Sequence, residues 1–152
     1  MGTTLQPSLA LLGRVLVSVI FLLSGVMKIM DWSGTLDHMA TQGMPASSFL
    51  LALATLAEIV GGLALLLGWL TRPAAFLLFL YLIPTTLIFH NFWAVEVARE
   101  QQNQMFHFLK NVAIMGGLLE LSAFGAGAWS LDSALAGVNR PVLAWRTGRR
   151  PV

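Results

Sequence analysis

Four long apolar runs are the feature that most constrains how this chain folds. They cover residues 8–30, 47–69, 73–93 and 106–128. Each run is long enough to cross the roughly 30 Å of hydrocarbon in a bilayer as a helix. A tryptophan stands at an end of each run, where indole rings gather at the membrane interface. The pattern predicts an all-α membrane protein, built as a bundle of four transmembrane helices.

The composition points to a lipid environment and excludes several classes of function. Hydrophobic residues make up 57 % of the 152 residues and charged residues only 11 %, whereas about a quarter of a soluble domain is charged. The length holds one domain and leaves no room for a separate catalytic domain. Because the chain has no cysteine, an iron–sulfur cluster, a thiolate zinc site and electron transfer through a disulfide of its own are excluded.

Basic residues predict the orientation, since short cytoplasmic loops retain Lys and Arg. With the N-terminus inside, the outer loops carry only Arg99, and the inner side receives Arg72, Arg140, Arg146, Arg149 and Arg150. Both termini are therefore expected in the cytoplasm. Residues 1–133 form the predicted four-helix domain, with a surface helix beginning near Ser130 or Asp132. Residues 134–152 form a basic tail, for which a membrane surface is a better partner than nucleic acid.

Three of the runs carry ionisable residues together with small ones at the spacing of one helix face. The faces are Arg14, Ser18, Phe21, Gly25 and Lys28; Ala54, Glu58, Gly61, Leu65 and Gly68; and Phe106, Lys110, Ala113, Gly117 and Glu120. A charge at the bilayer centre costs about 3 kcal/mol or more, so these faces are expected to point into the bundle. The small residues would let the helices approach closely there.

The depth of each charge along its run suggests partners. Arg14 and Glu120 lie at a similar depth toward the cytoplasm and are predicted to form a structural ion pair. Glu58 lies near the centre of the membrane, with Lys28 and Lys110 toward the outside. Glu58 is either an unpaired carboxylate that exchanges protons or binds a ligand, or the partner of Lys28 or Lys110. Alternatively, all these charges serve only to fix the register of the helices.

The third run differs, because it holds Tyr81, Pro84, Thr85 and Thr86 near its middle. Pro84 removes a backbone hydrogen bond and is expected to kink the helix. A kink beside the polar faces would shape a cavity, although proline also occurs in membrane helices for packing alone.

All three histidines, His38, His90 and His107, fall on the predicted outer side. One interpretation is that they are interfacial histidines bonded to loops. Another is a quinone site, in which a His or Lys donates to a ring carbonyl between aromatic walls. The walls would come from Phe92, Trp93, Phe106 and Phe108. A haem between His90 and His107 is disfavoured because both lie close to the rim, and a metal site of histidines alone is expected even less.

Short motifs follow one another along the chain: Gly13-Arg14, Ser24-Gly25 with Lys28, Ala57-Glu58 with Gly61-Gly62, Leu67-Gly68, Phe89-His90, Lys110-Asn111 with Gly116-Gly117, and Ser130-Leu131-Asp132. Their order and spacing resemble the DoxX family of small bacterial membrane proteins, over residues 8–133. The resemblance implies a four-helix protein of the bacterial inner (plasma) membrane. It implies that some relatives are the membrane subunit of a thiosulfate:quinone oxidoreductase and that others belong to oxidative-stress complexes. It also supports as functional candidates Arg14, Lys28, Glu58, His90, Lys110 and Asn111.

The leading hypothesis is a redox-associated membrane subunit that binds a quinone or another small hydrophobic molecule within the bundle. Its partners would be other membrane or redox subunits, or further copies of the chain. Glu58 is the predicted catalytic residue, no metal is expected, and the predicted ligand-binding residues are Lys28, His90, Trp93, His107, Lys110 and Asn111. Whether the chain is itself an enzyme stays open. Two alternatives also stay open: a non-catalytic scaffold of a larger membrane complex, and a small-molecule transporter formed by an oligomer.

Overall fold

The computed structural model describes residues 5–138, and this part of the chain is helical with no strand. The elements in order are α1 (Leu5–Met30), α2 (Trp32–Thr41), α3 (Ser48–Leu67), α4 (Thr71–Phe89), the 3-10 helix η1 (Phe92–Ala94), α5 (Ala98–Phe124) and α6 (Leu131–Val138). An all-α fold is therefore confirmed. Residues 139–152, which make up most of the predicted basic tail, lie outside the described residues.

Three helical stretches in the described part are long and apolar enough to cross a membrane: Leu5–Met30, Ser48–Leu67 and Thr71–Ala94. They match the first three predicted runs. The fourth run, 106–128, overlaps the later part of α5, which both begins and ends earlier than predicted and spans 27 residues. Polar residues at the start of α5, together with Lys110 and Glu120, make this helix less apolar than the other three.

One helix was not predicted from the sequence. The predicted outer loop 31–46 contains α2, and the Asp31 side chain caps this helix by accepting a hydrogen bond from the Gly34 amide at 3.1 Å. Met39 is the buried residue of α2, at 5 % exposure. The helix therefore lies against the bundle through this side chain.

The four long helices pack as two pairs, with α1 along α3 and α4 along α5, while α3 also contacts α4. Glycines allow the close approach. A Cβ added at Gly62 would lie 2.9 Å from Leu22 of α1, and one added at Gly61 would lie 2.8 Å from Leu78 of α4. Both are packing glycines, and Gly61 belongs to the predicted inward face of the second run. Gly116 is not a packing glycine, since an added Cβ there would meet no atom within 4 Å.

Buried apolar side chains from all four long helices form one core: Phe21, Leu65, Ala75, Leu78, Leu82 and Leu118. The outward faces carry many exposed Leu, Val and Phe side chains, which suits contact with lipid tails that are as apolar as leucine. The core and the lipid-facing surface together are those of a membrane bundle, in which polar groups lie inside.

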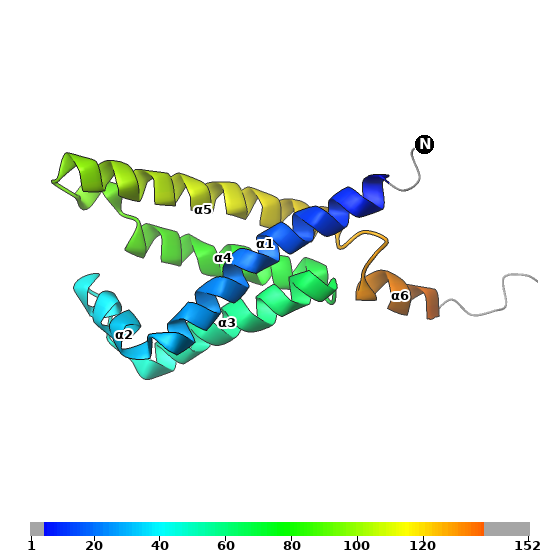
Figure 1. Cartoon of the computed structure of the whole chain (residues 1–152), viewed down its shortest axis with the longest axis horizontal. Helices are drawn as coiled ribbons and strands as arrows, with labels where there is room; N and C mark the ends of the chain where they lie inside the picture. The colour runs from blue at the N-terminus through cyan, green and yellow to red at the C-terminus, as the bar shows by residue number, and fades with distance from the viewer. Residues whose placement is uncertain (1–4, 139–152) are drawn as a thin grey trace, which may run out of the picture.

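The two ends of the bundle differ (Figure 1). At one end, called the Arg14 end here, the beginning of α1 lies beside the end of α5, and α6 lies at this end too. At the opposite end, called the Lys28 end, α1 and α5 have diverged and α2 lies below the beginning of α5 in the view. Polar side chains stabilise the Arg14 end, whereas the Lys28 end is open enough to hold a cavity.

Arg14 joins α1 to the loop that follows α5. Its side chain is buried, at 1 % exposure, and its guanidinium donates to the backbone carbonyls of Ala126 and, at 2.8 Å, Trp129. Glu120 is exposed on α5 and forms no ion pair with any residue between 5 and 138. The predicted Arg14–Glu120 ion pair is therefore not formed. The loop carbonyls take its place, because the chain after α5 folds back under the bundle and brings them to the guanidinium.

Asp132 of α6 caps α4 from outside that helix. Its carboxylate accepts hydrogen bonds from the amides of Leu70 and Thr71 at 2.8 and 3.0 Å, and α4 has no side-chain cap of its own. Burial would raise the pKa of Asp132, but the hydrogen bonds from Thr71 and Leu70 and the nearby charge of Arg14 outweigh it and hold this pKa below its usual value. Asp132 is therefore charged at neutral pH and fixes α6 to the beginning of α4.

Gly68 ends α3 next to the beginning of α6. Its φ is +67°, and an added Cβ would lie 2.5 Å from the Cβ of Ser130 and 2.8 Å from the Arg14 guanidinium, so only glycine fits. Its carbonyl accepts a hydrogen bond from the Asp132 amide at 2.8 Å. The predicted surface helix near Ser130 is confirmed as α6, since the Ser130 hydroxyl accepts from the Ser133 amide at 3.1 Å.

Candidate ligand-binding cavity

A cavity of about 800 Å³ lies inside the Lys28 end of the bundle. Helices α1 to α5 all contribute to its wall, and apolar side chains such as Ile20, Leu53 and Ile88 form most of it. Phe21 and Leu82 belong both to the core and to the cavity wall, so the packed core closes the cavity on the side of the Arg14 end. The divergence of the helices beyond this core leaves the space.

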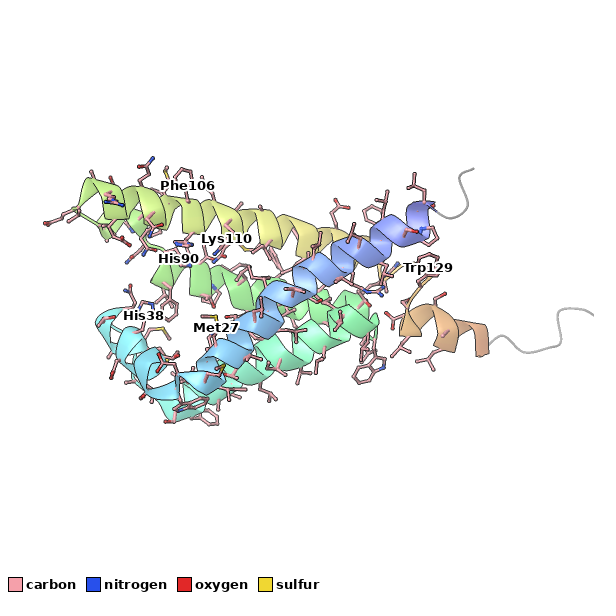
Figure 2. All side chains as sticks on the ribbon, in the orientation of Figure 1. Met27, His38, His90, Phe106, Lys110 and Trp129 are labelled. Carbon is pink, nitrogen blue, oxygen red and sulfur yellow. The ribbon has the colours of Figure 1, made fainter. Side chains whose placement is uncertain are left out.

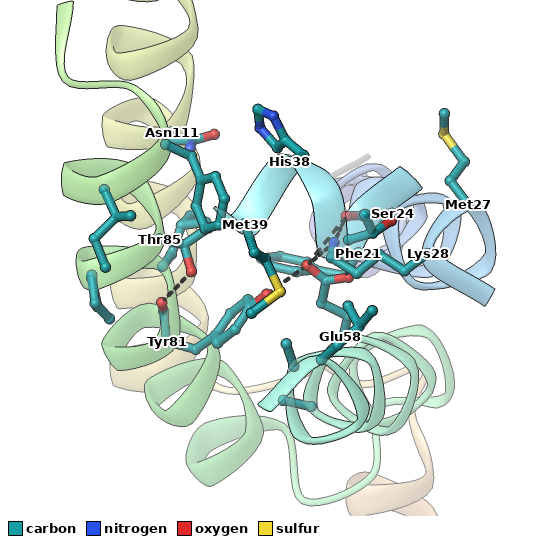
Figure 3. A pocket seen from close by; sticks show the side chains of 18 of the residues that line it. Phe21, Ser24, Met27, Lys28, His38, Met39, Glu58, Tyr81, Thr85 and Asn111 are labelled. Atoms are coloured by element: carbon teal, nitrogen blue, oxygen red, sulfur yellow. Dashed lines mark hydrogen bonds and ion pairs between the residues drawn. The ribbon is translucent and has the colours of Figure 1, made fainter. Parts of the chain in front are cut away.

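A cluster of four polar side chains lies in the cavity wall, with Glu58 at its centre (Figure 3). The ammonium of Lys28 lies 2.9 and 2.8 Å from the two carboxylate oxygens of Glu58. The Tyr81 hydroxyl donates to the same carboxylate at 2.8 Å and the Ser24 hydroxyl at 3.2 Å. Glu58 is 4 % exposed. The partner of Glu58 is therefore Lys28, and the cluster joins α1, α3 and α4.

Helix geometry explains how the sequence brings these groups together. Ser24 and Lys28 stand four residues apart on α1 and so share a face, and Lys28 also donates to the Ser24 hydroxyl at 2.6 Å. Gly25 lies on the same face, where an added Cβ would be 2.7 Å from Ile59 and 3.5 Å from the Cβ of Glu58. The missing side chain at Gly25 therefore lets α3 approach closely enough for Lys28 to reach Glu58.

Other predicted site residues lie on the opposite wall, formed by the end of α4 and by α5 (Figure 2). His90, Lys110 and Asn111 all line the cavity. Asn111 is buried and donates to the Thr86 hydroxyl at 3.1 Å, which fixes α5 against α4. His90 Nδ1 lies 2.9 Å from Gln104 Oε1. The wall opposite the Glu58 cluster thus also carries polar side chains, among them the cationic Lys110.

Helix α2 covers part of the cavity. Met39 and His38 both line it, and Figure 3 shows the Met39 side chain directed toward Tyr81 and the Glu58 cluster. The His38 ring stacks on Phe89 of α4 with their centroids 5.4 Å apart. These contacts link α2 to the helices on the far side of the cavity.

Two predicted ligand-binding residues, Trp93 and His107, do not line the cavity. Trp93 packs edge to face against Phe92 and Phe108 at 5.2 and 6.0 Å. Of the predicted aromatic walls, Phe92, Trp93 and Phe108 therefore contact one another, Phe106 is exposed, and none of the four lines the cavity. His107 accepts a hydrogen bond from Lys110 at 3.2 Å and so orients a cavity residue from behind.

The two histidines considered for a haem stack on each other. The ring centroids of His90 and His107 are 5.2 Å apart with an interplanar angle of 22°. Axial haem ligands must instead point their nitrogens at one iron from opposite sides. The geometry therefore does not fit a haem held by this pair.

Sequence reasoning missed three residues of the site: Ser24, Tyr81 and Met39. Tyr81 stands out as the single tyrosine of the chain, within the polar part of the third run, and this was the signal for it. Ser24 lies one helical turn before Lys28. Met39 gave no signal, because it belongs to a helix that was interpreted as a loop.

A family profile matches residues 9–91, more than half of the chain. This profile is that of DoxX. The chain belongs to the DoxX family. Similar proteins are two from Escherichia coli K12 and one from Mycobacterium tuberculosis H37Rv. Inner membrane protein YphA is 36 % identical over 127 residues, covering 84 % of this chain and 90 % of that protein. Inner membrane protein YqjF is 38 % identical over 125 residues, covering 82 % and 90 %.

The mycobacterial relative, the uncharacterized membrane protein Rv3486, is 30 % identical over 138 residues, covering 81 % of this chain and 78 % of that protein. No solved structure matches this DoxX chain. The apolar helices and the inner-membrane relatives together make it a multi-pass inner-membrane protein. The DoxX profile includes Lys28, Glu58, Tyr81 and His90 and ends before α5. The Glu58 cluster is thus within the part of the chain that the family profile describes.

Proposed function

We propose that this DoxX protein binds a quinone or another small hydrophobic molecule in its cavity, as the membrane subunit of a redox complex. The observation that carries the proposal is a largely apolar cavity of about 800 Å³ with the Lys28–Glu58–Tyr81 cluster in its wall. Sites for small molecules are concave, mostly apolar and about 300–1,000 Å³ in volume, with a few polar groups that orient the ligand. The cavity has these properties.

The donors in the wall suit a ligand with carbonyl oxygens. The Tyr81 hydroxyl and the Lys28 ammonium lie on one side, where both donate within the Glu58 cluster and would turn one donor to the ligand when it binds. Lys110 lies on the other side, with protons beyond the one that it donates to His107. The apolar side chains between them suit a ring that is otherwise hydrophobic. A quinone combines these features, because it has a flat apolar ring with a carbonyl at each end.

Glu58 is proposed to hold and exchange a proton beside the bound ligand. Its carboxylate is buried, lies in the wall and is bonded to two hydroxyls and one ammonium, all of which carry exchangeable protons. The chain has no cysteine, so the electrons for any reduction must come from another subunit. A partner protein with its own redox centre is therefore part of this proposal.

The proposal includes the placement of the chain in the membrane. We propose that α5 is the fourth span, since it packs along α4, and that its charged residues face the cavity or the membrane interface. The Arg14 end would face the cytoplasm, because Arg72 lies at that end, at the start of α4. The cavity would then lie toward the outer side.

Two matched substitutions on α3, each replacing an alanine by phenylalanine, test the binding function. Ala54 lines the cavity, whereas Ala52 is exposed on the same helix. The full chain is purified in nanodiscs from bacterial membranes, and its lipid extract is analysed by mass spectrometry. The proposal expects quinone to co-purify with the unchanged protein and with Ala52→Phe, and to be lost from Ala54→Phe. Equal quinone content in both variants would contradict it. If the unchanged protein instead co-purifies with partner proteins but without quinone, the scaffold alternative is favoured.

A further inference from the structure

The geometry points to a lateral opening of the cavity between α1 and α5, through which a ligand with a long apolar tail enters from the lipid. This inference rests on the proposed function, because it specifies the class of ligand and its route. The opening, called the α1–α5 opening here, is bordered by Ile20 and Met27 of α1 and by Lys110 and Ile114 of α5, which all line the cavity.

The contact between α1 and α5 is limited to the part near the Arg14 end. There, an added Cβ at Gly117 of α5 would lie 3.6 Å from Val17 of α1, and Phe21 of α1 and Leu118 of α5 belong to the same buried core. Beyond this point the two helices diverge toward the Lys28 end (Figure 1). Met27 and Lys110 therefore lie beyond these contacts toward the Lys28 end, whereas Ile20 and Ile114 pack against the core and form the inner edge of the opening.

Exposure shows that the cavity reaches the surface at this place. Met27 lines the cavity and is still 68 % exposed, and Lys110 is exposed as well. These two exposed wall residues lie on the two helices that diverge here, one on α1 and one on α5. Since α1 and α5 are helices with lipid-facing leucine surfaces, the outside at this depth is the hydrocarbon of the membrane.

Specific interactions hold the other pairs of neighbouring helices around the cavity together. Gly25 and Ile59 hold α1 and α3 in contact, and the Asn111–Thr86 hydrogen bond joins α5 to α4. The Tyr81–Glu58 hydrogen bond joins α4 to α3. Among the described residues, no hydrogen bond or ion pair joins the part of α1 from Ile20 onward to α5. The α1–α5 opening is therefore the place where helices can part at the lowest cost.

Lys110 gives the opening a polar edge. Its ammonium donates to His107 at 3.2 Å, which holds the charge at the Lys28 end while its aliphatic stem borders the opening. A ligand that enters here would place its polar head toward Lys110 and the Glu58 cluster and leave its tail among the lipid chains. Long-tailed quinones that are dissolved in the membrane have this form, whereas a water-soluble ring without a tail has no need of the opening.

Because the chain has no cysteine, an engineered pair of cysteines can close the opening specifically. Met27→Cys with Ala113→Cys places thiols on exposed positions of α1 and α5, which a flexible bismaleimide can bridge. Val60 and Leu77 are exposed, do not line the cavity and lie next to the close approach of Gly61 to Leu78. Val60→Cys with Leu77→Cys, between α3 and α4, is therefore the matched control. Both pairs are prepared in the full chain in nanodiscs, and the bridges are verified by mass spectrometry.

Binding of two probes is then compared before and after bridging: dimethoxy-methyl-benzoquinone without a tail, and its decyl-tailed analogue. The α1–α5 bridge is expected to slow association of the decyl quinone by about tenfold or more, because a required opening motion is blocked, and to leave binding of the tailless quinone unchanged. The α3–α4 bridge is expected to change neither. Unchanged association of the decyl quinone after α1–α5 bridging, or its loss only after α3–α4 bridging, overturns the route. If neither quinone binds the unbridged protein, the proposed function itself fails, and this inference fails with it.

Discussion

Lys28 of α1 and Glu58 of α3 form an ion pair in which the ammonium contacts both carboxylate oxygens, at 2.9 and 2.8 Å. The carboxylate is almost fully buried, and the lysine side chain keeps 22 % exposure. The pair therefore lies at the boundary between the packed core and the cavity. At this position it stabilises the contact between α1 and α3 and at the same time presents a charged group to a ligand.

The ion pair predicts a specific pattern of stability losses. Lys28→Met leaves the buried Glu58 carboxylate without its cation and is expected to cost about 3–5 kcal/mol of unfolding free energy. The double change Lys28→Met with Glu58→Leu removes both charges and is expected to cost less than Lys28→Met alone. Thermal unfolding of the purified proteins in one detergent measures both. If the costs of Lys28→Met alone and Glu58→Leu alone simply add in the double variant, the two residues do not interact.

Arg14 is predicted to stabilise the Arg14 end through loop carbonyls and not through Glu120. Arg14→Met leaves the carbonyls of Ala126 and Trp129 without their donor, at about 1–3 kcal/mol for each group that stays buried. Arg14→Lys is expected to rescue only part of the loss, because an ammonium cannot reproduce the planar fork that reaches both carbonyls. Glu120→Leu is expected to change thermal stability little. A loss of thermal stability in Glu120→Leu as large as that in Arg14→Met would instead support an ion pair between Arg14 and Glu120.

Asp132 predicts a dependence of stability on pH. Its pKa is lowered in the folded protein, so its contribution is complete above the usual carboxyl pKa and is lost as the pH falls through the lowered value. The melting temperature should therefore fall as the pH is lowered below about 5, and part of this fall should disappear in Asp132→Asn, which keeps a capping oxygen but cannot ionise. Asp132→Ala removes the cap and should cost about 1 kcal/mol at neutral pH. An identical pH profile for the unchanged protein and Asp132→Asn would refute this role.

The proposed orientation predicts which cysteines can be labelled from outside the cell. Gln42→Cys and Gln102→Cys lie at the Lys28 end and should react with a membrane-impermeant maleimide in intact cells. Ala136→Cys of α6 lies at the Arg14 end and should react only after the membrane is opened. Since the chain has no native cysteine, the signal is specific. Labelling of Ala136→Cys alone in intact cells would show that the chain has the opposite orientation. The description of the cavity and its cluster would not change.

The rotation of α1 and α3 could be predicted from the sequence. The rotation of α5 was predicted wrongly, since Phe106, Lys110, Ala113 and Glu120 of its predicted inward face are exposed and Asn111 and Leu118 are buried instead. The pairing between helices could not be predicted. The spacing of charges and small residues correctly turned Arg14, Glu58 and Gly61 inward, because side-chain direction within one helix follows from its period. The partner of Glu58 depended on the relative position of α1 and α5, on which that period carries no information. Lys28 and Lys110 lie at similar depth, and only the close α1–α3 contact at Gly25 decides between them.

Interactions with the backbone were also hidden from sequence reasoning. Arg14 donates to the carbonyls of Ala126 and Trp129, and every residue has a carbonyl, so no residue type marks such a partner. Helix α2 was missed because ten residues with one buried side chain give a weak periodic signal. The cavity depends on both features, since Met39 of α2 covers it and the Arg14 end closes the bundle opposite to it.

The central claim, that the cavity binds a quinone beside Glu58, is tested most directly by photolabelling. A benzoquinone with a decyl tail and an azide on the ring is irradiated with the full chain in nanodiscs, and the labelled peptides are identified by mass spectrometry. The account predicts adducts on cavity residues such as Met39 and Tyr81, suppressed by excess decyl quinone and by Ala54→Phe but not by Ala52→Phe. Adducts confined to the rim aromatics around Trp93, or cavity adducts equally strong in Ala54→Phe and Ala52→Phe, would contradict it.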